Sequence, residues 1–191
     1  MRTLTYYAAV SLDGRISSPD HDFSAFQTEG DHMQWIFGEY RDTIPKVALD
    51  ALGLSADRSR FDTVLMGWNT YAAGFPQGVR NPYPHLRQFV FSRTRTADDA
   101  APGIEVTSEN PLDVARHLKS EPEGSGIWLC GGGQLAGALL PEIDRLVLKV
   151  APALLGAGIP LVDGGYDPRQ FRRTAVRPFE SGVTVLEFER A

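Results

Sequence analysis

The stretch IWLCGGGQLAGALL (residues 127–140) places three consecutive glycines between an apolar run and a segment of helical composition. Ile127–Cys130 has the character of a buried strand, and a helix is expected to begin near Gln134 and to end before Pro141. Glycine loses more conformational entropy on folding than other residues, so three in series need a reason. The free N–H groups at a helix start favour an anion, and glycines let a phosphate approach the main chain. Gly131–Gly133 therefore predict either a dinucleotide site or a tight turn with positive φ.

The composition is that of a soluble protein of one domain. The chain has 191 residues, of which 42% are hydrophobic, and a formal net charge of -5. This acidic balance argues against a nucleic-acid surface, which needs a basic face. Cys130 is the single cysteine, so an internal disulfide is excluded. No signal-peptide pattern and no apolar run of roughly 20 residues occur, so we expect a cytoplasmic protein without a membrane partner.

Short runs rich in aliphatic and aromatic residues predict eight strands. They are Leu4–Val10, Thr63–Met66, Gln88–Phe91, Ile104–Val106, Ile127–Cys130, Leu146–Ala151, Arg172–Val176 and Val183–Phe188. The expected helices are Asp31–Tyr40, Val47–Leu52, a segment capped by Asn110, and the segment from Gln134. This alternation predicts an α/β fold with largely parallel strands, and the last two runs predict an antiparallel hairpin at one edge.

A second junction of strand, glycine and helix occurs in TVLMGWNTYAAG (residues 63–74). The strand ends at Gly67, and Asn69 or Thr70 is a candidate helix cap. Two such junctions in one α/β domain predict anion sites at neighbouring strand ends. The alternative is that Gly67 serves only the turn and Thr70 only the cap.

Two further strand ends carry weaker signals. Ser92 and Arg93, in QFVFSRT, follow a strand, and a hydroxyl beside a guanidinium suits a phosphate monoester. An exposed loop arginine is the simpler interpretation. In SLDG (residues 11–14), Asp13 and Gly14 follow the first strand, where Asp-Gly is common for backbone reasons alone.

The order of these pieces resembles the dihydrofolate-reductase-like superfamily. Within it, the chain is similar to the C-terminal reductase domain of the bifunctional deaminase–reductase of riboflavin biosynthesis. The resemblance runs from Thr3 to about Phe188, and LCGGGQL and APALLGAGIPLV are its most specific parts. It implies a single domain over residues 1–191, with a three-layer α/β/α fold around a mixed eight-stranded sheet that ends in an antiparallel hairpin.

The resemblance also implies NADPH as hydride donor, a small heterocyclic substrate of pyrimidine or pterin type, and a homodimer. The implied cofactor contacts are Gly14, Gly67, Trp68, Asn69, Thr70, Ser92, Arg93, Gly131, Gly132, Gly133, Gln134 and Leu135. Among them, Gly131–Gly133 would hold the diphosphate, and Ser92 with Arg93 would hold the 2′-phosphate of the adenosine.

The chain departs from the family pattern at two places. Trp68 stands where the family usually has arginine, which gives Arg93 a larger share of phosphate binding. YAAGFPQGVRNPYP (residues 71–84) does not match the substrate stretch of the riboflavin-pathway reductases. A non-catalytic or regulatory module that keeps the dinucleotide pocket is therefore the alternative function.

Asp31, in EGDHMQWIF (residues 29–37), lies where a dihydrofolate reductase places its proton-delivering acid. The prediction is a buried carboxyl with a raised pKa. Glu29 and His32 are rivals, and the alternative is an ordinary first-turn acid favoured by the helix dipole.

Lys149 and Cys130 are the remaining candidates. Lys149 alternates with Leu148 and Val150, so it faces a cavity or a partner, or it snorkels from a sheet edge. Cys130 lies in an apolar strand, which favours a core position over a nucleophile. No spacing of His, Cys and Asp is typical of a metal site.

Overall fold

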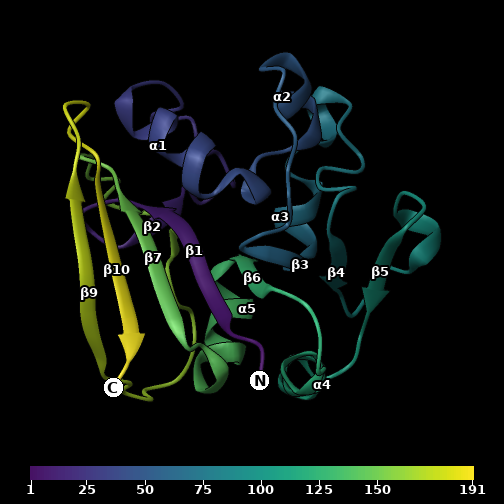
Figure 1. Cartoon of the computed structure of the whole chain (residues 1–191). Coiled ribbons are helices and arrows are strands. Elements are labelled where there is room, and N and C mark those ends of the chain that lie inside the picture. Colours follow the sequence, from purple (N-terminus) through teal and green to yellow (C-terminus); the bar gives the residue numbers. More distant parts are fainter.

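The computed structural model describes all 191 residues. The chain forms one large sheet with helices on both faces (Figure 1). The strands of this sheet are β1 Leu4–Val10, β3 Phe61–Gly67, β4 Arg87–Phe91, β5 Ile104–Thr107, β6 Gly126–Gly131, β7 Arg145–Val150, β9 Phe171–Pro178 and β10 Thr184–Arg190. Their spatial order is β5-β4-β3-β6-β1-β7-β10-β9. The eight predicted strands are thereby confirmed.

The six strands from β5 to β7 in this order run parallel, and β10 is antiparallel to both β7 and β9. The predicted C-terminal hairpin is confirmed as the antiparallel edge. β1 lies inside the sheet, with Tyr6 beside Leu129 of β6 and Leu146 of β7. Because the strands are parallel, the carboxyl ends of β3, β6 and β1 meet at one end of the sheet, where open α/β folds bind ligands.

Five α-helices and four short 3-10 helices connect the strands. The α-helices are α1 Asp31–Glu39, α2 Lys46–Ala51, α3 Trp68–Ala72, α4 Pro111–Ser120 and α5 Gly133–Leu139. The 3-10 helices are η1 Arg41–Thr43, η2 Phe75–Gln77, η3 Ala97–Asp99 and η4 Leu140–Glu142. The predicted cap of α4 is present, since the Asn110 side chain accepts from Leu112 N at 2.9 Å. No helix is long and apolar enough to span a bilayer.

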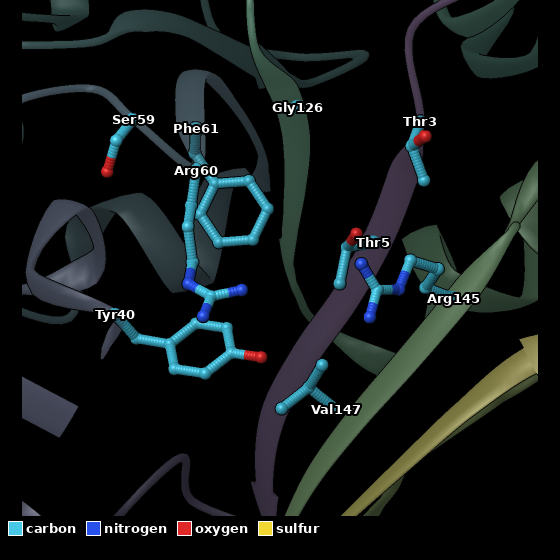
Figure 2. A pocket seen from close by; sticks show the side chains of 9 residues that line it. All are labelled: Thr3, Thr5, Tyr40, Ser59, Arg60, Phe61, Gly126, Arg145 and Val147. Carbon is cyan, nitrogen blue, oxygen red and sulfur yellow. The ribbon is translucent and has the colours of Figure 1, made fainter. Parts of the chain in front are cut away.

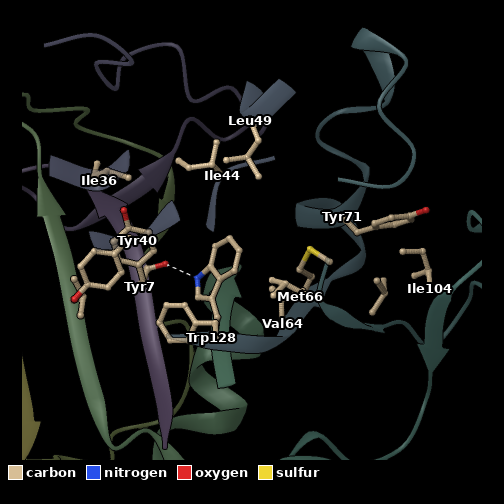
Figure 3. Packing of buried hydrophobic residues seen from close by; sticks show 14 of the residues in the cluster. Tyr7, Ile36, Tyr40, Ile44, Leu49, Val64, Met66, Tyr71, Ile104 and Trp128 are labelled. Atoms are coloured by element: carbon tan, nitrogen blue, oxygen red, sulfur yellow. Dashed lines mark hydrogen bonds between the residues drawn. The ribbon is translucent and has the colours of Figure 1, made fainter. Parts of the chain in front are cut away.

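Side-chain alternation along β1 gives each face of the sheet its own core. Tyr7 belongs to the first core, with Ile36 of α1 and Leu49 of α2. It stacks on Tyr40 at 4.8 Å between ring centroids, and its carbonyl accepts from the Trp128 indole N–H at 3.1 Å (Figure 3). Burial of each such aromatic side chain contributes about 1.5–3 kcal/mol to the free energy of unfolding.

The second core lies on the opposite face, under α4 and α5. Leu4 and Tyr6 of β1 pack there with Leu118 of α4 and Leu139 of α5. Two filled cores on opposite faces of one sheet confirm the expected three-layer α/β/α architecture.

A second, two-stranded sheet was not predicted from the sequence. It pairs β2, Arg15–Ser17, antiparallel with β8, Ile159–Pro160, and runs of three and two residues are too short to show alternation. The chain around β8, here called the brace segment (residues 158–164), lies directly on β2 and α5. Tyr6 donates its hydroxyl to Leu161 O at 2.8 Å, and Leu161 N donates to Gly14 O at 2.9 Å.

Glycines permit this close approach. A Cβ atom on Gly133 would lie 2.3 Å from Pro160 O, and one on Gly137 would lie 2.0 Å from Asp163 O. These distances are shorter than those that real Cβ atoms make with their neighbours, so a side chain at either position would force the brace segment away from α5.

Gly137→Ala should therefore destabilise the protein by about 2 kcal/mol, because the added methyl group overpacks the contact with Asp163. Gly38→Ala in α1 is the matched control, since no heavy atom lies within 4 Å of its built Cβ, and helix propensity alone predicts a gain of about 0.8–1 kcal/mol. Chemical unfolding of both variants measures the difference. Equal stability of the two would contradict the described contact.

Candidate functional site

The two glycine-terminated strands meet at the carboxyl end of the sheet. β3 and β6 are parallel neighbours that end at Gly67 and Gly131. A Cβ on Gly67 would lie 3.8 Å from both Gly131 O and Gly132 N, and one on Gly132 would lie 3.7 Å from Thr70 Oγ1. Gly67, Thr70, Gly131 and Gly132 therefore form one cluster, here called the glycine junction.

The fold constrains the three consecutive glycines to different degrees. Gly131 has φ +127, a conformation that side chains disfavour, and the Gly131–Gly132 peptide bond is cis. Gly133 makes room for Pro160 O of the brace segment. Gly132 has φ -84, and a Cβ there would meet only ordinary contacts with Thr70 at 3.7 Å and Ile16 at 3.9 Å. Gly132 is thus the one glycine of the three for which the fold itself gives no reason.

The helix starts beside the glycine junction have no side-chain caps. The expected cap by Asn69 or Thr70 is wrong, because α3 begins at Trp68 with Gly67 as its N-cap. The Asn69 amide instead lies 3.1 Å from His21 Nε2. At the start of α5 the N-cap is Gly132, again without a side-chain bond. The N–H groups of these first turns are therefore left for another acceptor.

Three other predicted contacts are placed as follows. Gln134 is exposed at the start of α5, whereas the Leu135 side chain is buried in the second core, so only its backbone faces the junction region. Gly14 has φ +75 in the SLDG turn. Asp13 of that turn accepts from Leu155 N at 3.1 Å and from Gly156 N at 2.7 Å, which gives the motif a structural role.

The end of β4 adds an arginine that the sequence reasoning missed. Ser92 Oγ accepts from Arg95 N at 3.0 Å and from Thr94 N at 3.2 Å, which turns the chain back toward α3. The Arg95 guanidinium then lies 5.3 Å from the centre of the Trp68 ring. Arg95 is exposed and also pairs with Asp99 at 3.5 Å, and Arg93 is exposed as well. A cation therefore lies beside the Trp68 ring.

An apolar cavity of about 380 Å³ adjoins the glycine junction through Thr70. Phe23, Val47, Tyr71, Val79 and Tyr83 are among its lining residues. Two long irregular stretches of the chain, residues 19–30 and 73–84, both contribute to this lining. The cavity has the concave and mainly apolar character of small-molecule sites.

A second pocket, of about 250 Å³, lies at the opposite end of the strands (Figure 2). Arg60 and Arg145 reach it from two sides of the sheet face, near the Tyr40 hydroxyl. Both cations are already paired, Arg60 with Glu39 and Arg145 with Glu187 at 3.5 Å. This pocket is at the amino ends of β1, β3, β6 and β7, away from the glycine junction.

The prediction of a buried acid at Asp31 is wrong. The side chain is exposed, and its carboxylate accepts from Glu180 N at 2.7 Å and from Ser181 N at 3.1 Å in the β9–β10 turn. Desolvation raises the pKa of Asp31, but the backbone N–H groups of Glu180 and Ser181 outweigh it, so the net pKa is lowered. An acid that stays ionised is a poor proton donor near neutral pH.

His32, a rival to Asp31, is buried and also tied to the β9–β10 turn. Its Nδ1 lies 2.9 Å from Ser181 Oγ and its Nε2 lies 3.3 Å from Gln27 O. The third candidate, Glu29, is exposed. The start of α1 is therefore an anchor for the hairpin, and no group of three His, Cys, Asp or Glu side chains in the structure could hold a metal ion.

Comparison with known proteins identifies the family of this fold. The model of the RibD C-terminal domain matches residues 2–185. The chain belongs to the RibD C-terminal domain family. The Bacillus subtilis protein YwjB, described as uncharacterized, is 28% identical over 197 residues, covering 100% of this chain and 99% of YwjB. YyaP of the same organism, also described as uncharacterized, is 32% identical over 151 residues, covering 72% of this chain and 78% of YyaP.

Solved structures of this family share the fold. A putative riboflavin biosynthesis protein from Shewanella sp. PV-4 has a TM-score of 0.75 at 19% identity and 99% coverage of both chains. A pyrimidine reductase-like protein from Corynebacterium diphtheriae has a TM-score of 0.67 at 14% identity, covering 100% of this chain and 92% of that one. The deaminase/reductase of Thermotoga maritima has a TM-score of 0.66 at 17% identity, with 57% of its chain covered.

Asp31→Asn should destabilise the protein at neutral pH, because the carboxylate accepts hydrogen bonds from two backbone N–H groups of the β9–β10 turn. Since the folded-state pKa is lowered, this contribution is present above the ordinary aspartate pKa and is lost as the pH falls through the folded-state value. Denaturant unfolding across an acidic pH series measures it. The gap between wild type and variant should close at low pH, whereas Glu29→Gln, an exposed control, should show no gap at any pH.

Proposed function

We propose that this protein is an NADPH-dependent reductase of a small heterocyclic substrate of pyrimidine or pterin type. The observation that carries the proposal is that the fold does not require glycine at position 132, since a Cβ there would meet only ordinary contacts, with Thr70 at 3.7 Å and Ile16 at 3.9 Å. Thr70 also lines the apolar cavity of about 380 Å³. Together they offer bare backbone for a dinucleotide beside an apolar surface.

The strand order supports binding of an extended dinucleotide. Ser92 follows β4, Gly67 ends β3, Gly131 ends β6, and β1 comes next in the sheet. Three strand spacings of about 4.8 Å give a track of roughly 14 Å along the carboxyl ends. Arg93 and Arg95 lie at one end of this track, where a 2′-phosphate would bind, and Gly132 lies toward the other.

Residues of this chain would position the cofactor, which supplies the hydride when bound. Gly131 and Gly132 let the diphosphate and the nicotinamide lie against the main chain, and the uncapped N–H groups of α3 and α5 are free to donate to phosphate oxygens. Ile16 and Thr70 border the same space.

The names of structural relatives point to the same chemistry. The Thermotoga protein is described as a 5-amino-6-(5-phosphoribosylamino)uracil reductase joined to a deaminase, and the Corynebacterium protein as pyrimidine reductase-like. At 17% and 14% identity these names support a reduced heterocycle as a class of substrate. The homodimer and the cytoplasmic location expected from the sequence stay predictions.

A non-catalytic dinucleotide-binding module is the second candidate. The observation in its favour is that Asp31 is bound to the β9–β10 turn and does not face the junction. Such a module would bind NADPH without oxidising it in the presence of pterins, pyrimidines or quinones. Turnover with any of these compounds would reject it.

Gly132→Ala tests the proposed function. The variant should fold with near wild-type stability, because φ is -84 and the new methyl group meets only ordinary contacts. Its dissociation constant for NADPH should rise at least about tenfold, since the methyl group occupies the space of the ligand. Titration followed by the fluorescence of Trp68 measures this change. Gly165→Ala, at a position with open space around its Cβ, is the control.

Two results of this titration would count against the proposal. Wild-type protein that binds neither NADPH nor NADH at millimolar concentration would remove the dinucleotide site. An unchanged dissociation constant for Gly132→Ala would move that site away from the glycine junction.

Arg95→Ala should weaken NADPH binding more than NADH binding, because the 2′-phosphate is the group that distinguishes the two. Loss of one charged hydrogen bond, about 1.5–3 kcal/mol, corresponds to a factor of roughly ten or more. Paired titrations of Arg93→Ala and Arg95→Ala with both nucleotides measure this ratio. Arg172→Ala, on the exposed edge strand β9, is the control and should leave both affinities unchanged. An equal loss for NADPH and NADH would contradict the assignment.

A further inference from the structure

Lys149 lies in the interior of the sheet, on the face that packs against α1. On β7 it pairs with Ala9 of β1 and with Val185 of β10. Alternation puts it on the same face as Val147, a member of the first core. Since β10 and β9 lie beyond β7, the alternative of a lysine that snorkels from a sheet edge is wrong.

The ammonium group of Lys149 makes neither a hydrogen bond nor an ion pair with another residue. Its contact within the chain is a cation–π contact with Tyr7, in which Nζ lies 5.1 Å from the ring centre. Burial, the main cause, lowers the pKa of Lys149 to about 8, although Cys130 acts in the opposite direction. An unpaired cation in such surroundings is costly, and costly charges are typical of functional sites.

The charged side chains that face this region are engaged elsewhere, and the Tyr7 hydroxyl is buried without a hydrogen-bond partner. Glu187 of β10 is paired with Arg145, and Arg177 of β9 lies over the Trp35 ring of α1. His32 of α1 is bonded to Ser181 and Gln27, and the pKa of the Cys130 thiol is raised to about 12 mainly by burial. No carboxylate therefore balances Lys149.

The parallel strands bring Lys149 and the glycine junction to the same end of the sheet. Gly131 ends β6, Ala9 lies next to the end of β1, and Lys149, the partner of Ala9, lies next to the end of β7. Each strand is about 4.8 Å from its neighbour. Ala9 and Lys149 are both partly exposed although they lie on a covered face of interior strands, so the α1 layer does not close completely over them. This part of the sheet face is therefore open to a ligand.

We propose that the Lys149 ammonium binds an exocyclic oxygen of the substrate, a planar oxo-heterocycle that rests over Ala9 with its reacting edge toward Gly132. This assignment rests on the proposed reductase function. An ammonium group offers three donors and no acceptor, so it selects an oxo group or an oxyanion and rejects an amino group in the same place.

Barbiturate, a planar trioxopyrimidine that is anionic at neutral pH, is the probe for this site. Calorimetric titration of the NADPH-saturated protein should give binding that weakens at least tenfold in Lys149→Met and is largely retained in Lys149→Arg. 2,4,6-Triaminopyrimidine, which has amino groups in place of the oxygens, should bind wild type more weakly than barbiturate does. Thermal unfolding should show Lys149→Met as stable as wild type or more so, because the variant removes an unpaired charge.

Chemical labelling tests whether barbiturate binds at Lys149 itself. Reductive methylation with formaldehyde and cyanoborohydride, read by mass spectrometry, should modify Lys149 more slowly when barbiturate is present. Lys46 on α2, which is paired with Asp50 and exposed, is the internal control and should be unaffected.

The outcomes separate this inference from the proposed function. Wild type that binds NADPH but not barbiturate, or equal barbiturate affinity in wild type and Lys149→Met, would overturn the role of Lys149. Barbiturate binding that depends on Lys149 in a protein that fails to bind NADPH would support the oxygen-binding site and overturn the reductase proposal.

Discussion

The main chain of the brace segment lies in direct contact with β2 and α5, and the geometry of the site depends on this contact. Gly133 and Gly137 provide the surface on α5, and Gly158 approaches Ser17 O, where a Cβ would be 2.1 Å away. The Tyr6 hydroxyl adds a bond from the central strand to Leu161 O. Because α5 is held in this way, its first residue and the two glycines before it are fixed relative to β1 and β3.

This constraint explains why glycine recurs around the site with different consequences. Where the backbone of the protein itself occupies the space of a side chain, as at Gly133, the glycine is a requirement of packing. Where a side chain would meet only ordinary contacts, as at Gly132, packing does not require the glycine. The distinction is local and steric, and it separates the glycines of the GGG sequence that the fold requires from the one that it does not.

Much of the architecture was predictable because its signals are local. Most of the eight main strands are runs rich in apolar residues, and the α4 cap is a hydrogen bond between Asn110 and a residue two positions away. The glycine junction was also predictable, since parallel strands must bring their ends together. The family and the three-layer fold follow from the order of these pieces.

The remaining features depend on contacts between distant parts of the chain. The Asp31 carboxylate accepts hydrogen bonds from the backbone N–H groups of Glu180 and Ser181, about 150 positions away. Nothing near Asp31 in the sequence indicates these partners. Arg95 reaches Trp68 only because Ser92 turns the chain after β4. β2 and β8 are short segments that pair because the brace segment folds back.

The site divides into two halves with different chemistry. One half, at the ends of β4, β3 and β6, combines bare backbone with arginines and suits an anionic dinucleotide. The other half, at β1 and β7 and under α1, combines an apolar floor with the unpaired ammonium of Lys149 and suits a neutral or anionic oxo-ring. The two halves adjoin where β6 lies beside β1, which is where transfer between two bound rings would take place.

A crystal structure of the protein grown with NADPH is the most direct measurement. The nicotinamide should pack against the main chain of Gly132 between Ile16 and Thr70, with the diphosphate at the first turns of α3 and α5 and the 2′-phosphate toward Arg95. A cofactor bound at the amino ends of the strands, near Arg60 and Arg145, or a Gly132 surface closed by Ile16 and Thr70 with NADPH absent, would contradict a dinucleotide site at the glycine junction.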